Sequence, residues 1–543
     1  MGLIVNVKSA LRAEDFVRVG LDRRDFIEDL NKPLLELSRG NYWTGVDATS
    51  HTHFFGRTGG GKTSAAKWLA GAMLRSGWGA LITAVKPEDI ALWKGYAKEH
   101  GRGNSLLLFD GENETLNFLE YLIRVNGMDG IGTVTECLMK ILEAARRASS
   151  AASNRGGDEF WNDAARQVLR YAIPVLYSAT GTLSIPEIIR FITTAPASVK
   201  EVTDRAWQDR SFMYKVMNAA CHRPIVPMAR SALQDALNYW AEQFCAIPDR
   251  TRGNVLISIT TVLDRFNHGR LRRAFTEGST VVPELTFGGG LLLGAMPTTI
   301  WQEDGVIAQS LLKFLWMRAV ISRNNLAPQH RERPVFLWCD EAQETVSSYD
   351  GEFLSICRSS KCAVVYLSQT LPGYIAKIGG DSPRDAALGL VGKFATHVLM
   401  ANSCPETNEF AARMVGRVVK QRGTYNKGTS ESVNVGMNAG NSENSGSSSS
   451  FSTSYGQGGG VNSSSGSSDG SGNSWGENRG RGTSRNFSVG CTESIEYAIE
   501  PGDFGRILKT GGPRNGNEVT AIWYQAGRVF TSGTNFLLAR FKQ

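Results

Sequence analysis

The segment GRTGGGKT, from Gly56 to Thr63, constrains the fold of this chain more than any other part of its sequence. The apolar run THFF precedes it, and TSAAKWLAGAMLRS after it carries apolar residues at helical spacing, so the segment joins a strand to a helix. Glycines at this density let the backbone aim its N–H groups at phosphate oxygens with no Cβ in the way. Strand, glycine-rich loop and helix in this order predict a phosphate-binding loop.

The residue types of this loop suit a nucleoside triphosphate. We expect Lys62 to reach the β- and γ-phosphates and the Thr63 hydroxyl to ligate Mg²⁺, so ATP and Mg²⁺ are the predicted cofactors. The alternative is a glycine-rich turn with an incidental lysine. That alternative does not explain why the complete spacing G-x-x-x-x-G-K-S/T occurs between a strand and a helix. The predicted nucleotide-binding residues are Gly56, Arg57, Thr58, Gly59, Gly60, Gly61, Lys62, Thr63 and Ser64.

The segment VFLWCDEAQ supplies the acidic partner of this loop. Its apolar part, Val335 to Cys339, predicts a strand buried on both faces, and Asp340 and Glu341 follow at the carboxyl edge, where open α/β sheets bind ligands. We expect Asp340 to hold Mg²⁺ through its water shell and Glu341 to orient and deprotonate the attacking water. A solvated acidic turn is the alternative, and the presence of the glycine loop argues against it.

Two further residues are predicted to act on the same phosphates. CAVVYLSQT predicts a neighbouring buried strand that ends at Ser368 and Gln369, and Gln369 would sense the γ-phosphate and report it to the subunit contact. Arg358 lies between the two strands and is the candidate for a cation inserted from the adjacent subunit to stabilise transition-state charge. An ordinary strand end and an ordinary surface arginine are the respective alternatives.

The spacing of strand and helix patterns predicts an α/β protein with a parallel sheet, interrupted by a large all-α insertion. A length of 543 residues suggests roughly three or four folding units. The predicted parts are an N-terminal segment 1–44, a first nucleotide-binding part 45–126, an all-α insertion 127–280, a second nucleotide-binding part 281–427, a Ser/Gly-rich segment 428–490, and C-terminal strands 491–543 that complete the sheet.

The Ser/Gly/Asn-rich segment 428–490 favours a flexible chain, because it offers too little apolar surface to offset the entropy of ordering. A polar β-hairpin remains the alternative, since Phe451, Thr453 and Tyr455 alternate at the period of a strand. After this segment, EVTAIWYQAGRVFTSGTNFLLARF predicts two strands around Ala526-Gly527 at the edge of the main sheet.

Taken together, these motifs resemble the coupling proteins of conjugation and type IV secretion, the TraD/TraG family, within the FtsK/HerA superfamily of P-loop ATPases. The resemblance covers roughly 45–425 and the last fifty residues. Besides the glycine loop and the order DEAQ, Arg358, YLSQ, it is carried by ITAVKPED (82–89), FDGENETLNFLEYL (109–122) and DEFWNDAARQVL (158–169), the last of which looks like the entry to the family's all-α domain.

The resemblance implies a RecA-like motor domain that forms a homo-hexamer and moves DNA through a central channel by ATP hydrolysis. It implies Lys62, Asp340, Glu341, Gln369 and Arg358 in the roles given above, with a relaxase and components of the secretion channel as partners. Most coupling proteins carry N-terminal transmembrane helices, whereas residues 1–44 are too polar to span a bilayer. We therefore expect a cytoplasmic protein that reaches the inner membrane only through a partner.

Contacts to DNA are expected from clusters of basic residues, with sequence-independent and salt-sensitive binding. The net charge of +7 permits a polyanionic partner, although charge runs are often solvated faces. Two other functions stay open: a FtsK/HerA-like pump for packaging, segregation or defence, and a non-motor docking protein switched by ATP. The clusters are Arg265, Arg270, Arg272 and Arg273; Arg417, Lys420, Arg422 and Lys427; and Arg479, Arg481 and Arg485.

Overall fold

The computed structural model describes two compact units of the chain. The first unit comprises Met1–Asn408 and Gly502–Gln543, and the second comprises Glu409–Pro501. The residues described are 26–126, 130–148, 158–326, 328–379, 382–436, 450–455, 461–466 and 478–543.

The first unit is built on a nine-stranded sheet with the order β15-β14-β9-β3-β8-β7-β4-β6-β5. All seven strands from β9 to β5 pair in parallel, whereas at one edge β14 pairs antiparallel with β9 and β15 pairs antiparallel with β14. The strands are β3 Thr52–Phe55, β4 Gly79–Thr83, β5 Leu106–Phe109, β6 Leu291–Gly294, β7 Val335–Cys339, β8 Cys362–Ser368, β9 Thr396–Leu399, β14 Glu518–Gln525 and β15 Phe536–Lys542. The predicted α/β class and the return of the C-terminal strands to the sheet edge are confirmed.

Helices cover this sheet because the central strands are largely apolar and are buried along their whole length. Within the first unit the crossover and covering helices are α3 Gly45–Thr49, α4 Lys62–Arg75, α5 Pro87–Glu99, α17 Thr298–Trp301, α18 Glu303–Ser322, α19 Pro328–Arg331, α20 Ser348–Ile356, α21 Leu371–Ile378, α22 Pro383–Val391 and α24 Asp503–Arg506. Before them, β1 Pro33–Ser38 and β2 Asn41–Thr44 form a small hairpin.

Helix α18 is the most deeply buried of these, with apolar residues around its whole circumference. Among the described residues, Glu303–Asn325 meets the length and hydropathy expected of a membrane span, as does the bent pair Trp161–Thr180 with Ile185–Thr193. However, 72% of the apolar stretch in Glu303–Asn325 lies inside the protein. Burial against the sheet explains its composition.

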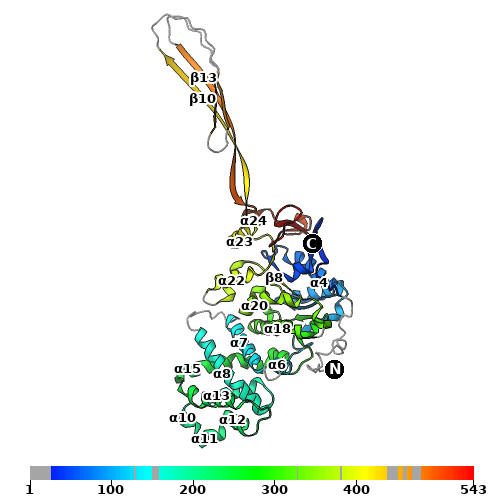
Figure 1. Cartoon of the computed structure of the whole chain (residues 1–543), viewed down its shortest axis with the longest axis vertical. Helices are drawn as coiled ribbons and strands as arrows, with labels where there is room; N and C mark the ends of the chain where they lie inside the picture. Colours follow the sequence, from blue (N-terminus) through cyan, green and yellow to red (C-terminus); the bar gives the residue numbers. More distant parts are fainter. Residues whose placement is uncertain are drawn as a thin grey trace. The chain divides into compact units, whose positions relative to one another are not determined.

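The predicted all-α insertion is present between β5 and β6, where its helices gather into one helical lobe (Figure 1). The apolar faces expected in this region pack together, as in α7 against α8 and α8 against α12. Its helices are α6 Phe118–Asn126, α7 Gly130–Ala148, α8 Asp158–Thr180, α9 Ile185–Thr193, α10 Val199–Val202, α11 Arg205–Arg210, α12 Phe212–His222, α13 Arg230–Asn238, α14 Phe244–Ala246, α15 Asp249–Asp264 and α16 Gly269–Phe275.

The second unit contains a β-ribbon, drawn with β10 and β13 side by side in Figure 1. Helix α23, Pro405–Val415, leads into β10, Arg417–Gly436, which pairs antiparallel with β13, Asn478–Tyr497. The shorter strands β11, Ser450–Tyr455, and β12, Val461–Gly466, extend the sheet to the order β10-β13-β12-β11.

The expectation of a flexible Ser/Gly segment is therefore wrong for these described strands, which form the polar hairpin that the period-2 alternation indicated. Backbone hydrogen bonds stabilise these strands in place of apolar burial, because each residue of β10 pairs with one of β13 in unbroken register. The unit also reaches further than the predicted 428–490, from Glu409 to Pro501. Residues 437–449, 456–460 and 467–477 of the segment lie outside the described residues.

Candidate nucleotide-binding site

The glycine loop connects β3 to α4 and has the backbone that the motif requires. Gly59 and Gly61 adopt φ values of 70° and 85°, a region that residues with a Cβ rarely enter. A Cβ on Gly60 would lie 2.8 Å from the Arg57 carbonyl oxygen, and one on Gly61 would lie 2.6 Å from Val519 of β14. The loop tip is exposed, and glycine at the N-cap leaves the first N–H groups of α4 without a capping side chain. This backbone fits a phosphate group.

Lys62, the first residue of α4, lies folded over its own loop. Its Nζ donates to the Gly56 carbonyl oxygen at 2.8 Å, and the side chain is 8% exposed. Burial lowers the pKa of Lys62, while the carboxylates of Glu341 and Asp340 act in the opposite direction. A cation kept this close to two acidic residues is available to a triphosphate bound between them.

Thr63 and Asp340 line one narrow cavity together with Asp89, and the rest of its lining is Ala66, Leu92, Trp93, Tyr96, Trp338 and Leu367. The volume of this cavity is 10 Å³, about the space that a single water or ion requires. Burial, followed by the charges of Asp89 and Glu341, raises the pKa of Asp340 to about 6 against the opposing effect of Lys62. A hydroxyl and two carboxylates that repel each other suit a hard divalent cation, so these residues fit Mg²⁺.

Glu341 is buried and held by several donors at once. Gln369 Nε2 donates to Oε1 at 3.0 Å, Gln343 Nε2 donates to Oε2 at 3.0 Å, and Lys86 Nζ lies 3.6 Å from Oε1. Burial raises the pKa of Glu341, but the bonds from Gln343 and Gln369 and the charges of Lys62 and Lys86 outweigh it, so the net pKa is lowered. The carboxylate is therefore ionised at neutral pH, as a base requires.

The strand order explains why these residues meet. β3, β8 and β7 are consecutive neighbours, and all three run parallel, so the segments after them emerge at one edge. Lys62 follows β3, Gln369 follows β8, and Asp340 with Glu341 follows β7. The structure thus brings together Lys62, Thr63, Asp340, Glu341 and Gln369, with Gln369 acting on Glu341.

Arg358 is not part of this cluster. It is exposed in the 3₁₀ turn Cys357–Ser360, which precedes β8 and therefore lies at the amino edge of the sheet. From there it cannot reach the glycine loop of its own chain. Its predicted role across a subunit contact stays a prediction.

Sequence reasoning missed three residues of the site, namely Lys86, Asp89 and Gln343. Lys86 and Asp89 follow β4, which pairs directly with β7, so the carboxyl ends of neighbouring parallel strands again meet. Asp89 accepts hydrogen bonds from the backbone N–H groups of Val85 at 3.0 Å and Lys86 at 2.8 Å, which fixes its carboxylate at the start of α5. The signal was the polar end of ITAVKPED.

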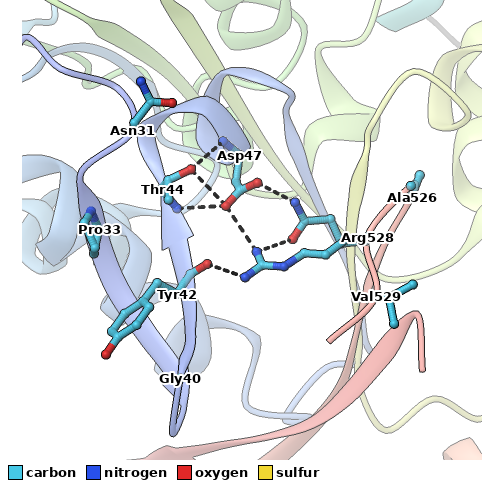
Figure 2. Close-up of a pocket in the computed structure, with 11 residues that line it drawn as sticks. Asn31, Pro33, Gly40, Tyr42, Thr44, Asp47, Ala526, Arg528 and Val529 are labelled. Carbon is cyan, nitrogen blue, oxygen red and sulfur yellow. Dashed lines mark hydrogen bonds and ion pairs between the residues drawn. The ribbon is translucent and has the colours of Figure 1, made fainter. Parts of the chain in front are cut away.

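A separate cavity of 640 Å³ lies at the opposite edge of the sheet, beside α3 and the loop after β14 (Figure 2). Its polar groups satisfy one another: Arg528 pairs with Asp47 at 3.2 Å and donates to the Tyr42 carbonyl oxygen at 2.8 Å, and Gln525 Nε2 donates to Asp47 at 2.5 Å. With these groups already paired, this cavity is a weaker candidate for the phosphates than the glycine loop.

The first two basic clusters are largely engaged within the chain. Arg265 pairs with Glu303 and Asp304, and Arg270 stacks over Trp301. Ion pairs also engage Arg272 with Glu277, Arg273 with Glu112, Lys420 with Glu496 and Glu500, and Arg422 with Glu496, while Arg417 stacks over Tyr497. The side chains of Lys427, Arg479, Arg481 and Arg485 lie outside the described part. DNA contacts by these clusters stay predictions. The ion pairs that the first two clusters form within the chain weaken the case that these two contact DNA.

No protein-family model matches the chain, and no curated protein matches its sequence. Solved structures do match. An unbound form of the bacterial conjugative coupling protein TrwB is 14% identical with a TM-score of 0.51, covering 97% of this chain and 90% of that one. The plasmid coupling protein TrwB in complex with the non-hydrolysable GTP analogue GDPNP is 14% identical with a TM-score of 0.50, covering 98% and 92%. The resemblance expected from the motifs is confirmed in the fold: the chain is built like a coupling-protein P-loop NTPase with an all-α insertion.

Proposed function

We propose that this chain is a Mg²⁺-dependent ATPase that moves DNA in conjugation or type IV secretion. One observation carries the proposal: residues far apart in the sequence, Lys62 and Thr63 on one side and Asp340 and Glu341 on the other, meet at one edge of the sheet beside a backbone shaped for phosphate. This is the arrangement that phosphoryl transfer to water requires.

In this proposal each residue has a distinct task. The glycine loop and the N-terminus of α4 hold the phosphates, and Lys62 turns from the Gly56 carbonyl oxygen to their charge. Thr63, Asp340 and Asp89 would hold Mg²⁺, which would neutralise the negative charge that develops on the phosphate oxygens. Glu341 takes the proton of the attacking water while Gln369 keeps its carboxylate in place.

A cavity of 460 Å³ gives Glu341 the space that this step needs. Its lining includes Glu341, Gln369, Lys86 and Gln343, together with Glu303 at the start of α18. A water placed there would lie against the ionised carboxylate of Glu341.

The proposal extends to a homo-hexamer, to sequence-independent DNA binding and to delivery of relaxase-bound DNA. Support comes from the fold shared with a conjugative coupling protein. We place the motor in the cytoplasm, peripheral at the inner membrane through a channel partner.

The test is the ATPase rate with and without single- and double-stranded DNA, measured together with particle mass. Lys62→Ala and Glu341→Gln should both abolish hydrolysis, and only Glu341→Gln should retain ATP, because binding and water activation lie on different residues. Equal loss of ATP binding in both variants would contradict this division.

The internal pairing of the first two basic clusters keeps one alternative open, a docking protein in which ATP only switches conformation. A rate that DNA leaves unchanged, in protein that forms no ring with nucleotide, would establish that alternative. A rate stimulated by DNA with a packaging or nuclease gene as genomic neighbour would instead favour a FtsK/HerA-like pump.

A further inference from the structure

Glu341 has a strained backbone. Its φ is +44°, in the left-handed region that residues with a side chain avoid, and it precedes the 3₁₀ turn Ala342–Glu344. Such a conformation persists only where the surrounding structure imposes it. Something must therefore hold the segment after β7 in place.

Helix α21 and strand β8 contact the turn itself, and α18 holds the residue that follows it. Lys313, in the middle of α18, donates from Nζ to the Thr345 carbonyl oxygen at 2.6 Å, just after the strained turn. The same Nζ donates to Asp350 Oδ1 at 2.7 Å. Both side chains are buried, at 2% and 0% exposure, so water does not compete for these bonds.

Asp350 also binds residues of α20 and β8. It accepts from Tyr366 Oη of β8, and from the backbone N–H and the hydroxyl of Ser347, the latter two at 2.7 Å, at the start of α20. Burial raises the pKa of Asp350, but Lys313 and these donors outweigh it and leave it below its usual value. One ionised carboxylate thus joins α18, α20 and β8, the strand that precedes Gln369.

Stability alone does not account for this pair. Replacing a buried ion pair by neutral residues of similar size is often harmless or stabilising, because two charges must be desolvated to form it. The pair does fix the local geometry, because the Lys313 ammonium holds one carbonyl oxygen and one carboxylate at the same time.

We infer that Lys313 and Asp350 are positioning residues, which hold Glu341 in its strained turn and in line with the attacking water. The inference rests on the proposed ATPase function. A displacement of about 1 Å at a catalytic group can lower a rate by about 10²-fold, which is the size of effect expected here. Binding of ATP by the glycine loop should be unaffected.

The experiment compares purified full-length variants in ATPase assays without DNA. Lys313→Met/Asp350→Asn removes both charges together, so that no unpaired charge is left buried. Tyr366→Phe removes a single donor to Asp350 and is the milder variant. Arg252→Met is the matched control, because Arg252 is also a buried cation that donates to a carbonyl oxygen, that of Ala197 at 2.9 Å, within the all-α insertion.

We expect the double variant to lose about 10²-fold in kcat with KM for ATP unchanged, and Tyr366→Phe to lose less. Arg252→Met should lower Tm and leave kcat unchanged. A folded double variant with parental kcat, or a parental kcat in Tyr366→Phe if the double variant does not fold, would overturn the inference. Glu341→Gln tests the proposed function separately from the inference. If this variant hydrolyses ATP at the parental rate, the proposed function fails together with the inference.

Discussion

If Asp340 holds Mg²⁺ as proposed, its carboxylate favours the metal-bound protein and destabilises the metal-free one, and replacing Asp340 should show this directly. Burial, Asp89 and Glu341 raise its pKa from 3.8 to about 6 in the folded chain. Because a tenfold change in an acid dissociation constant corresponds to about 1.4 kcal/mol, the ionised carboxylate destabilises the metal-free fold by roughly 3 kcal/mol at neutral pH. Asp340→Asn removes the charge and keeps the shape. We expect the variant to unfold at a higher temperature than the parent at pH 7.5 in EDTA.

The pH dependence follows from the same raised pKa. Below about pH 4 Asp340 is protonated in both the folded and the unfolded chain and contributes nothing. Between about pH 4 and 6 only the unfolded chain releases the proton, so the stability of the parent falls as pH rises, and above about 6 the full penalty is present. The gain in Tm of Asp340→Asn should therefore be large at pH 7.5 and small at pH 4.5.

Differential scanning calorimetry at the two pH values, with EDTA or with Mg²⁺ and ATP, measures this effect. Mg²⁺ and ATP should raise the Tm of the parent and have less effect on the variant, which has lost a ligand. Asp385→Asn, at an exposed position in α22, is the control and should show neither effect. An Asp340→Asn protein that is less stable than the parent in EDTA at pH 7.5 would refute the reasoning.

Three further outcomes test the rest of the site. Gln369→Leu removes a donor that lowers the pKa of Glu341, so the acid limb of the kcat–pH profile should move to higher pH; an unmoved limb would count against the contact. Gly61→Ala should abolish ATP binding and destabilise the loop by on the order of 1–2 kcal/mol through its positive φ. Adding Val519→Ala should recover some Tm but no binding in calorimetry, since it relieves only the clash. Arg358→Ala mixed with Lys62→Ala should regain ATPase activity if Arg358 acts across subunits, and mixed rings that assemble without activity would contradict that role.

Much of the central sheet could be predicted because its strands carry a local signal. Val335–Cys339 and Cys362–Ser368 are apolar without interruption, as strands covered on both faces must be, and polar residues mark where each ends. The glycine loop is equally local, since its function needs backbone freedom within a few residues. Lys62, Asp340 and Glu341 were therefore found without knowledge of the strand order.

Residues that depend on neighbouring strands were harder to find. Asp89 belongs to the site only because β4 pairs with β7, a relation between distant segments that no local pattern contains. In the sequence Lys313 is only one polar position in an apolar helix. Its role depends on its partners Thr345 and Asp350, which only the structure identifies. The strand β10 was missed for another reason: its order comes from backbone pairing, while composition reports on apolar burial.

The strand order also shows where the large insertion joins the sheet. The insertion enters after β5 and returns before β6, the two strands at the far end of the sheet, with β4 and β7 between them and the strands of the glycine loop and Gln369. Its two connections are tied to each other by backbone hydrogen bonds, from Leu116 N to the Ala274 oxygen at 2.8 Å and from Thr280 N to the Thr115 oxygen at 2.9 Å. The insertion also contacts the core beyond this neck, because α7 packs against α18 and Ala148 of α7 lines the cavity beside Glu341. The insertion is therefore joined to the core by helix packing as well as by its two connections.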